Sequence, residues 1–322
     1  MHREQAKARH RQASGQAAES DRGQSPRAGR KPGRGELILA VPAILATFLW
    51  AYWPALVKVV AAWEQQPDYS HGYFVVPLAL YFCWARRDRF PSRAVGQIVW
   101  PGLLVILLSI AIRIAGARYY VDAIDAWSMV VWVAGVVWLL GGWRVFLWAS
   151  PSIGFLLFMI PLPWSAERWL SLPLQRIATR LSTWVFQVLG QPAIAEGNTI
   201  WLGDYQLEVE QACSGLRIFV GVFALACAYG ILVRRVWWER GLLLLSALPI
   251  ALVANATRIV VTGLLSRWVS GDAAHKFTHD ISGWVMIPYA ALLFALVLAY
   301  LGRLTREVES LKAGEVLHDP VI

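Results

Sequence analysis

The sequence predicts an all-α fold: a polytopic integral membrane protein with about eight transmembrane helices. Three observations support this prediction. Hydrophobic residues make up 57% of the 322 residues, charged residues make up only 16%, and the mean hydropathy is +0.48. The apolar residues form runs that match a hydrocarbon core about 30 Å thick, which about 20 helical residues cross. Lysine and arginine gather in alternate loops between these runs, which is the orientation signal of membrane proteins.

Eight apolar runs in the sequence are the candidate spans. They are Leu37 to Val57, Gly72 to Ala85, Ile98 to Ala115, Ala123 to Leu140, Val145 to Pro163, Cys213 to Val233, Leu242 to Leu265 and Trp284 to Leu301. The second run is short, so we expect it to be tilted or partly interfacial. The first run follows a long basic region without a prompt small-residue cleavage site, so we expect it to stay as an anchor.

The charges of the loops predict the orientation. Basic residues gather in the N-terminal tail, in Arg86 to Arg89, at Arg144, in Arg234 to Arg240, and at Arg303 and Arg306. Because positive loops stay on the cytosolic side, we expect a multi-pass protein of the bacterial inner membrane with both termini in the cytosol. The extracytoplasmic loops are then Gln65 to His71, Gly116 to Asp122, Trp164 to Ala212 and Ser266 to Ser282.

Composition divides the chain into three parts. Residues 1–35 are basic and almost free of aliphatic side chains, so they are expected to form a disordered cytosolic tail. Residues 36–303 form the transmembrane domain, with residues 164–212 as an extracytoplasmic insertion, and residues 304–322 form a cytosolic C-terminal tail. A net charge of +9 would suggest a nucleic-acid partner in a soluble protein. Here much of the excess lies in the tail and short loops, so the expected partner is the lipid bilayer and not nucleic acid.

The extracytoplasmic insertion has two patterns. From Trp164 to Gly190, apolar residues recur at helical spacing against polar ones, which predicts an amphipathic helix at the outer interface. From Ala193 to Val209 the sequence alternates and is interrupted by Gly197-Asn198 and Gly203-Asp204, which predicts a small hairpin-like element. This element leads directly into Glu210 and Cys213.

Cys213 is the candidate nucleophile. The chain has three cysteines, Cys83, Cys213 and Cys227, so at least one thiol is free. Cys227 follows Cys213 on the same predicted helix and lies about 21 Å deeper, so the two cannot form a disulfide. Small residues follow Cys213 at the expected helix start, where free N–H groups stabilise a thiolate and can donate to an oxyanion. The alternative for each cysteine is a small apolar residue in helix packing.

Histidines of the outer loops are candidate proton carriers for such a thiol. His275 and His279 lie four residues apart in the loop after the seventh span, so both can face the same way on a helix. Either one can equally be a polar residue of a solvated loop. His71, before the second span, is a structural residue or one that faces substrate.

Arginine inside an apolar run is the other anomaly, because a charge at membrane depth costs roughly 3 kcal/mol and usually faces a protein or water-filled interior. Arg258 is such a residue, with Asn255 and Thr262 one turn away on the same polar stripe. The alternative is that Arg258 snorkels to the outer interface. Arg217 follows Cys213 by one helical turn, so spacing alone favours Arg217 as the group that polarises a carbonyl or holds the thiolate.

Three motifs occur in order along the chain. They are Ala212-Cys213-Ser214-Gly215-Leu216-Arg217, Asn255-Ala256-Thr257-Arg258-Ile259 and His279-Asp280-Ile281-Ser282-Gly283-Trp284, with lesser matches in Tyr69-Ser70-His71-Gly72-Tyr73, Ile160-Pro161-Leu162-Pro163 and Glu196-Gly197-Asn198. Through these motifs, from about Leu37 to Leu301, the chain resembles the exosortase/archaeosortase family of membrane cysteine transpeptidases. Family members often have a glutamate two residues before the cysteine, where this chain has Gln211 with Glu210 beside it.

The resemblance implies a catalytic cysteine, arginine and histidine, which map to Cys213, Arg258 and His279. Substrate-binding roles are expected for four further residues: Arg217, Asn255, His71 and Glu210. The implied substrates are secreted proteins whose C-terminal sorting signal combines a short Pro-Glu-Pro-like motif, a transmembrane helix and a basic cluster. We expect cleavage through a thioester, without a cofactor or a metal ion.

Two other classes of function compete with this expectation. A transporter or export component for an envelope polysaccharide precursor would use the buried arginine and asparagine to line a polar path. Such proteins often have two related halves and a site at the membrane midplane, whereas the unusual residues here gather at the predicted outer edge. A non-catalytic scaffold, or a hydrolase without transfer, is the third class.

Overall fold

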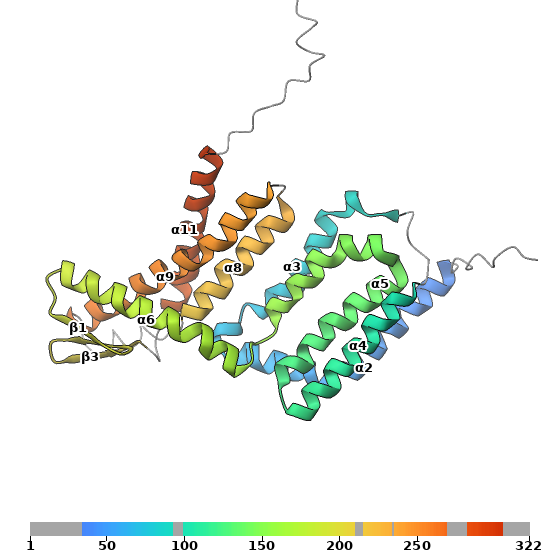
Figure 1. Ribbon diagram of the computed structural model, residues 1–322, viewed down its shortest axis with the longest axis horizontal. Coiled ribbons are helices and arrows are strands. Elements are labelled where there is room, and N and C mark those ends of the chain that lie inside the picture. The colour runs from blue at the N-terminus through green and yellow to red at the C-terminus, as the bar shows by residue number, and fades with distance from the viewer. Residues whose placement is uncertain (1–33, 93–98, 210–214, 234, 269–281, 305–322) are drawn as a thin grey trace, which may run out of the picture.

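The computed structural model describes residues 34–92, 99–209, 215–233, 235–268 and 282–304 (Figure 1). These residues are mostly helical. The main helices are α2 (Arg34–Gln65), α3 (Gly72–Ala85), α4 (Trp100–Tyr119), α5 (Asp122–Phe155), α6 (Trp164–Val188), α8 (Gly215–Leu232), α9 (Trp237–Trp268) and α11 (Ser282–Leu304). Short 3₁₀ turns are η1 (Pro67–Tyr69), η2 (Arg87–Arg89) and η4 (Leu156–Met159). The predicted all-α fold class is confirmed.

Six helical segments within the described residues are long and apolar enough to cross a membrane. They are Pro42–Gln65, Trp100–Tyr119, Asp122–Met159, Gly215–Leu232, Trp237–Ser266 and Val285–Leu304. Gly72–Ala85 is a shorter apolar helix, in agreement with the short second run of the sequence. The chain is therefore a multi-pass protein embedded in the lipid bilayer.

Helix α5 contains two of the predicted spans because it is broken at Gly142. This residue has φ of 72° and ψ of 178°, a conformation that glycine adopts readily and other residues avoid. The ribbon reverses there, so the two parts of α5 run in opposite directions (Figure 1). The predicted runs Ala123 to Leu140 and Val145 to Pro163 thus occur as separate segments joined by a tight bend.

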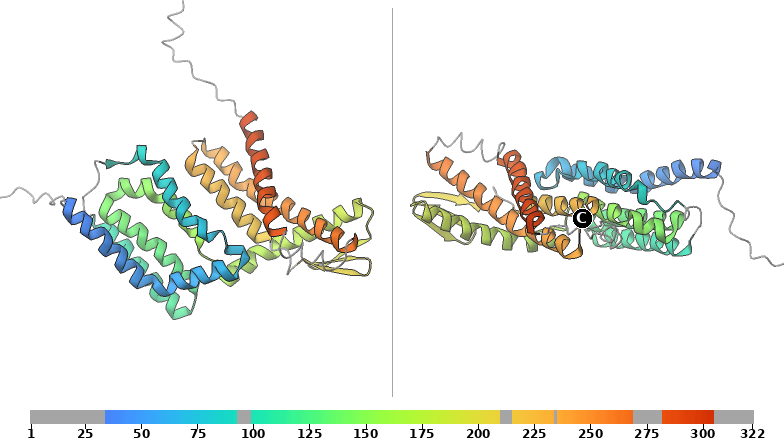
Figure 2. Two further views of the ribbon diagram at one scale, coloured as in Figure 1. Left: turned by 180° about the vertical axis from the view of Figure 1, so that it is seen from behind. Right: turned by 90° about the horizontal axis from the view of Figure 1, so that it is seen from above.

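Close contact between α4 and α5 depends on glycine. A side chain at Gly102 would overlap the main chain of Leu139, and one at Gly135 would lie 2.9 Å from the backbone nitrogen of Ile106. Small residues of this kind let membrane helices approach closely without the hydrophobic drive that packs soluble helices. The result is a bundle of α2 to α5 beside a second bundle of α8, α9 and α11 (Figures 1 and 2).

The insertion lies across one end of the two bundles (Figure 1). Helix α6 is amphipathic as predicted, and Leu174, Ala178 and Phe186 are on its buried face. The polar Gln175 and Ser182 are buried with them, whereas the apolar Ile177 and Trp184 are exposed. Three antiparallel strands follow, β1 (Ala193–Glu196), β2 (Thr199–Leu202) and β3 (Tyr205–Glu208), in the order β1-β2-β3. The predicted hairpin-like element is therefore a three-stranded meander, and its two turns lie at Gly197-Asn198 and Gly203-Asp204, which interrupt the alternating pattern of the sequence.

Two glycines form the turns of the meander, and a buried apolar cluster holds the insertion in place. Gly197 and Gly203 have φ of 63° and 64°, which a tight turn between antiparallel strands requires. Apolar side chains of α6, the strands and α9 form one buried cluster: Ala178, Phe186, Ala193, Ile200, Leu202, Leu207, Val209, Ile259 and Val260. Burial of this cluster fixes the insertion on the second half of α9.

A second cluster positions the start of α8. It joins α8, α9 and α11 through side chains that include Ile218, Val222, Ala254 and Met286. Helix α8 also packs against α5 and η1, so it lies at the junction of the two bundles. This junction is where the described residues among those singled out in the sequence lie: His71, Arg217, Asn255 and Arg258.

Candidate active site

The described residues contain part of the predicted site. Arg258, Asn255, Arg217 and His71 are described, whereas Cys213, Glu210, His275 and His279 lie outside the described residues. The assignment of the nucleophile and of the histidine therefore stays a prediction.

Helix α8 begins against α9. Gly215 is buried, and a methyl group in its place would lie 3.1 Å from Nδ2 of Asn255 and 3.8 Å from Cβ of Leu174 on α6. The Asn255 side chain is 1% exposed. Because only glycine lacks a Cβ, it permits this approach of three helices. The contact brings together the first two sequence motifs, since Gly215 follows Cys213 by two residues.

Arg258 lies one turn beyond Asn255 on α9 and is half-buried. Its Nε atom is buried and has no hydrogen-bond partner within the described ranges, and the same is true of Thr262 Oγ1. The polar stripe predicted from the sequence is therefore inside the protein. A snorkelling arginine would keep its polar atoms at the surface, so the burial of Nε argues against that alternative. Buried arginine donors of this kind are typical of functional sites in membrane proteins.

Arg217 lies on the first turn of α8 and connects it to η1. Its guanidinium is 3.5 Å from Oγ of Ser70, and its charge interacts with the Asp68 carboxylate and with Arg258. Two guanidinium groups and one carboxylate thus act on each other at the start of α8. Arg217 and Arg258 place two positive charges here, and positive charge suits a developing oxyanion or a substrate carboxylate.

His71 precedes α3 and is held by the main chain. Its Nε2 lies 3.0 Å from the carbonyl oxygen of Phe158, and its ring also bonds to the main chain of Asp68. Burial lowers the pKa of His71, and the nearby Arg217 charge acts in the same direction. A neutral imidazole that donates to Phe158 joins η1 to η4, so the geometry favours the structural alternative for His71. Substrate contact by this residue stays a prediction.

Tyr69 and Glu167 belong to the same region, although the sequence did not single out Glu167. Tyr69 is 4% exposed, and its hydroxyl accepts a hydrogen bond from Leu162 N at 3.2 Å and bonds to the Glu167 carboxylate. Burial raises the pKa of Tyr69 to about 12. Burial, followed by the Asp68 charge, raises the pKa of Glu167. In sequence Glu167 looks like any acid on the polar face of an amphipathic helix, so no signal marked it.

The Tyr69 bonds hold the segment from Ile160 to Trp164 against η1. Replacing Tyr69 with phenylalanine leaves the N–H of Leu162 without its acceptor, and an unsatisfied buried donor costs about 1–3 kcal/mol. We therefore expect Tyr69→Phe to lower the thermal unfolding midpoint of the purified protein in detergent. Tyr73→Phe is the matched control. The Tyr73 hydroxyl makes only a long hydrogen bond, 3.5 Å to Glu64 Oε1, and Tyr73 is 46% exposed, so water can replace that bond. Equal midpoints for the two variants would contradict the role of Tyr69.

The lowered pKa of His71 predicts a pH effect on stability. Below its ordinary value of 6.5, the unfolded chain takes up a proton that the folded protein does not bind. The free energy of unfolding is therefore expected to fall as the pH drops from about 6.5 towards the lowered folded pKa. His71→Gln retains a donor for Phe158 and removes the titration, so this part of the slope should disappear. The measurement is denaturant unfolding in detergent between pH 5 and 8.

Glu167→Gln is a control because the titration of Glu167 is expected to change the free energy of unfolding with pH in the opposite direction. Because the folded pKa of Glu167 is raised above 4.5, the folded protein gains stability as the pH falls through that raised value. Glutamine mimics the protonated acid, so its advantage over glutamate should be largest at neutral pH and should vanish towards pH 4.5. Identical pH profiles for wild type and both variants would contradict these assignments.

The two described cysteines, Cys83 on α3 and Cys227 on α8, are free and half-buried. Cys227 packs against the apolar cluster of the first bundle, as expected of a small packing residue. Within the described ranges no three histidine, cysteine, aspartate or glutamate side chains lie together in a way that would hold a metal ion.

Comparison with known proteins identifies the family. The family model described as transmembrane exosortase (Exosortase_EpsH) matches residues 63–296, which is more than half of the chain. The matched range includes the Tyr69 region, the insertion, and all three motifs around Cys213, Arg258 and His279. No curated protein and no solved structure matches the chain. The chain belongs to the transmembrane exosortase family.

Proposed function

We propose that this protein is a cysteine transpeptidase that cleaves C-terminal sorting signals of secreted proteins through a thioester on Cys213. Its family processes sorting signals at the membrane, which gives the protein a role of that general kind. The observation that carries the finer proposal is the contact of Gly215 with Asn255, which brings the Cys213 motif and the Arg258 motif to one place.

In the proposed first step, the Cys213 thiolate attacks the carbonyl carbon of the scissile peptide bond. Arg258 and N–H groups at the start of the helix donate to the resulting oxyanion. His279 gives a proton to the leaving amine, the C–N bond breaks, and the new N-terminal part of the substrate remains on Cys213 as a thioester. The buried Nε of Arg258 supports this role, since it is a donor that the described residues leave unused.

In the proposed second step, an acceptor amine or water attacks the thioester carbonyl. His279 takes the proton that the attacking amine or water loses, the C–S bond breaks, the Cys213 thiolate leaves, and the processed protein is released. Arg217 and Asn255 hold the substrate main chain beside the thiol, and Glu210 contributes to substrate binding. The substrate's own transmembrane helix approaches laterally through the bilayer, so that its signal meets the outer end of α8.

Trapping the intermediate tests this proposal. The purified protein in nanodiscs is incubated with a tagged substrate that carries the tripartite signal, and the reaction is quenched in acid. We expect a substrate fragment joined to the Cys213 peptide in mass spectra, and its release by hydroxylamine, which attacks thioesters. Cleavage without this adduct in wild type, together with undiminished cleavage in the presence of a thiol-blocking reagent, would rule out the thioester route.

A further inference from the structure

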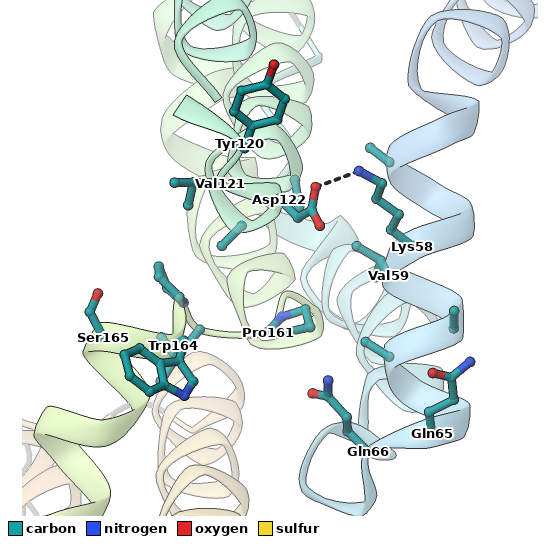
Figure 3. Close-up of a pocket in the computed structure, with 17 residues that line it drawn as sticks. Lys58, Val59, Gln65, Gln66, Tyr120, Val121, Asp122, Pro161, Trp164 and Ser165 are labelled. Carbon is teal, nitrogen blue, oxygen red and sulfur yellow. Dashed lines mark hydrogen bonds and ion pairs between the residues drawn. The ribbon is translucent and has the colours of Figure 1, made fainter. Parts of the chain in front are cut away.

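A cleft lies beside the candidate active site, and its described lining does not include His71, Arg217, Asn255 or Arg258. It has a volume of about 620 Å³ and lies between α2, the junction of α4 and α5, and the segment Pro161 to Ser165 (Figure 3). This volume is in the range of sites that bind small molecules and lipid headgroups. The lining combines apolar walls with polar groups at the rim.

An ion pair stands at one side of the cleft. Nζ of Lys58 donates to Oδ1 of Asp122 at 2.6 Å, and the two side chains are 58% and 69% exposed. Figure 3 shows both side chains facing each other across the gap between α2 and α5. A pair this exposed contributes little to stability, and both charged groups are accessible to a ligand. The cleft therefore offers an ammonium and a carboxylate side by side.

The apolar wall of the same cleft is buried. Ala55, Val59 and Ala126 line it and are at most 4% exposed. Gln65, the last residue of α2, and Gln66, which follows it, extend the polar rim (Figure 3). A ligand that fills the cleft must therefore be amphipathic, with charges at one place and hydrocarbon at another.

The position of the cleft matches the boundary between lipid headgroups and acyl chains. Asp122 begins one candidate span, and the neighbouring span ends at Tyr119. Tyr119, Tyr120 and Trp164 around the cleft are 73%, 92% and 70% exposed. Exposed tyrosine and tryptophan at the ends of membrane helices mark the interface with water. A bilayer lipid is thus the amphipathic molecule that this cleft meets at high concentration.

We propose that this cleft binds one phospholipid whose headgroup carries both a phosphate and a primary amine. The phosphate pairs with Lys58, the ammonium group pairs with Asp122, and the glycerol backbone and upper acyl chains lie along the apolar wall. A choline headgroup has no N–H to donate to Asp122, and a glycerol headgroup has no cation for it. The cleft is therefore selective for phosphatidylethanolamine over phosphatidylcholine and phosphatidylglycerol.

Lipid binding is independent of the proposed peptidase activity, although the two sites share a wall. Pro161 to Ser165 line the cleft, and Leu162 of this segment donates its N–H to Tyr69 beside the candidate active site. An occupied cleft holds this segment in place. A loss of peptidase activity leaves the lipid measurement unaffected, so failure of one proposal is distinguishable from failure of the other.

Native mass spectrometry of the full chain in detergent, titrated with each of the three lipids, tests the proposal. We expect one tightly bound phosphatidylethanolamine, with the other two lipids about tenfold weaker because each loses a charge-assisted hydrogen bond. The double variant Lys58→Gln/Asp122→Asn is expected to lose this selectivity. The matched control is Arg118→Gln/Glu64→Gln, which removes the same charges from the same end of the protein outside the cleft.

Two outcomes with the wild-type protein overturn the proposal, and one with the double variant does so as well. One is equal affinity of the wild type for all three lipids, a result that needs no variant to fold. The other is displacement of bound lipid by an equal concentration of soluble glycerophosphoethanolamine, because a headgroup without acyl chains should not compete with the lipid. Retained selectivity in Lys58→Gln/Asp122→Asn would place the lipid elsewhere.

Discussion

Replacing Cys213 with alanine is expected to abolish processing of the sorting signal, with a loss of cleavage rate on the order of 10⁴-fold or more. Alanine has no nucleophile, so no thioester can form, and water attacks the peptide bond only at its slow uncatalysed rate. Full-length substrate should then accumulate in the membrane fraction. The measurement is the ratio of full-length to processed substrate in cells that co-express both proteins.

The other two cysteines are matched controls for this prediction. Cys83 and Cys227 are half-buried in helix packing, so Cys83→Ala and Cys227→Ala should process substrate at wild-type rates. A membrane-impermeant thiol reagent applied from outside should label the wild type and both controls but not Cys213→Ala. Normal processing by Cys213→Ala would refute the proposed chemistry. No processing by the wild type, together with no labelling of Cys213 from outside, would favour a transporter, which needs no reactive outer thiol.

The spans were predictable because lipid imposes a simple rule on the sequence. Every backbone polar group must be satisfied inside the segment, so an apolar run such as Leu242 to Leu265 can only be a helix. The helical spacing of apolar residues in α6 likewise predicted a helix there, and the glycines at 197 and 203 predicted the turns of the insertion. The bend at Gly142 was harder to predict from the sequence. A pair of glycines inside an apolar run indicates that the helix is weak there, but it does not give the direction of a bend.

The sequence indicated which residues belong to the candidate site, but it did not indicate which of them are in contact. Asn255 and Arg258 stood out because polar residues are rare in an apolar run. That Gly215 would pack on Asn255 depends on the crossing of α8 and α9, which no local pattern specifies. The bonds of Tyr69 to Leu162 and Glu167 join segments about 90 residues apart. Such long-range pairs leave no trace in the sequence of either partner.

Sequence spacing and structural geometry favour different arginines as the oxyanion-binding group. Spacing placed Arg217 nearer to Cys213, yet Arg217 is 3.5 Å from Ser70 and interacts with Asp68, so part of its charge is already engaged. Arg258 has a buried Nε without a hydrogen-bond partner among the described residues. A donor that the described residues leave without a partner can serve a transition state, which is what an oxyanion-binding group must do.

Arg258→Lys and Arg258→Ala are therefore expected to lower kcat by about 10²–10³-fold with little change in KM, because an oxyanion donor acts mainly in the transition state. Lysine keeps the charge but lacks the planar fork, so it should not restore the rate. Arg217→Ala is expected to raise KM more than it lowers kcat, since the proposed role of Arg217 is to hold substrate. The measurement is steady-state cleavage of a tagged substrate by each variant in nanodiscs.

Arg180→Ala is the control for loss of an arginine as such, because Arg180 lies on the exposed face of α6 and should tolerate the change. Unfolding midpoints in detergent show whether each variant is folded before its kinetics are compared. If Arg217→Ala loses kcat and Arg258→Ala loses only substrate affinity, the two roles are exchanged. The oxyanion would then be held from the first turn of α8 itself, and the unused Nε of Arg258 would belong to substrate binding.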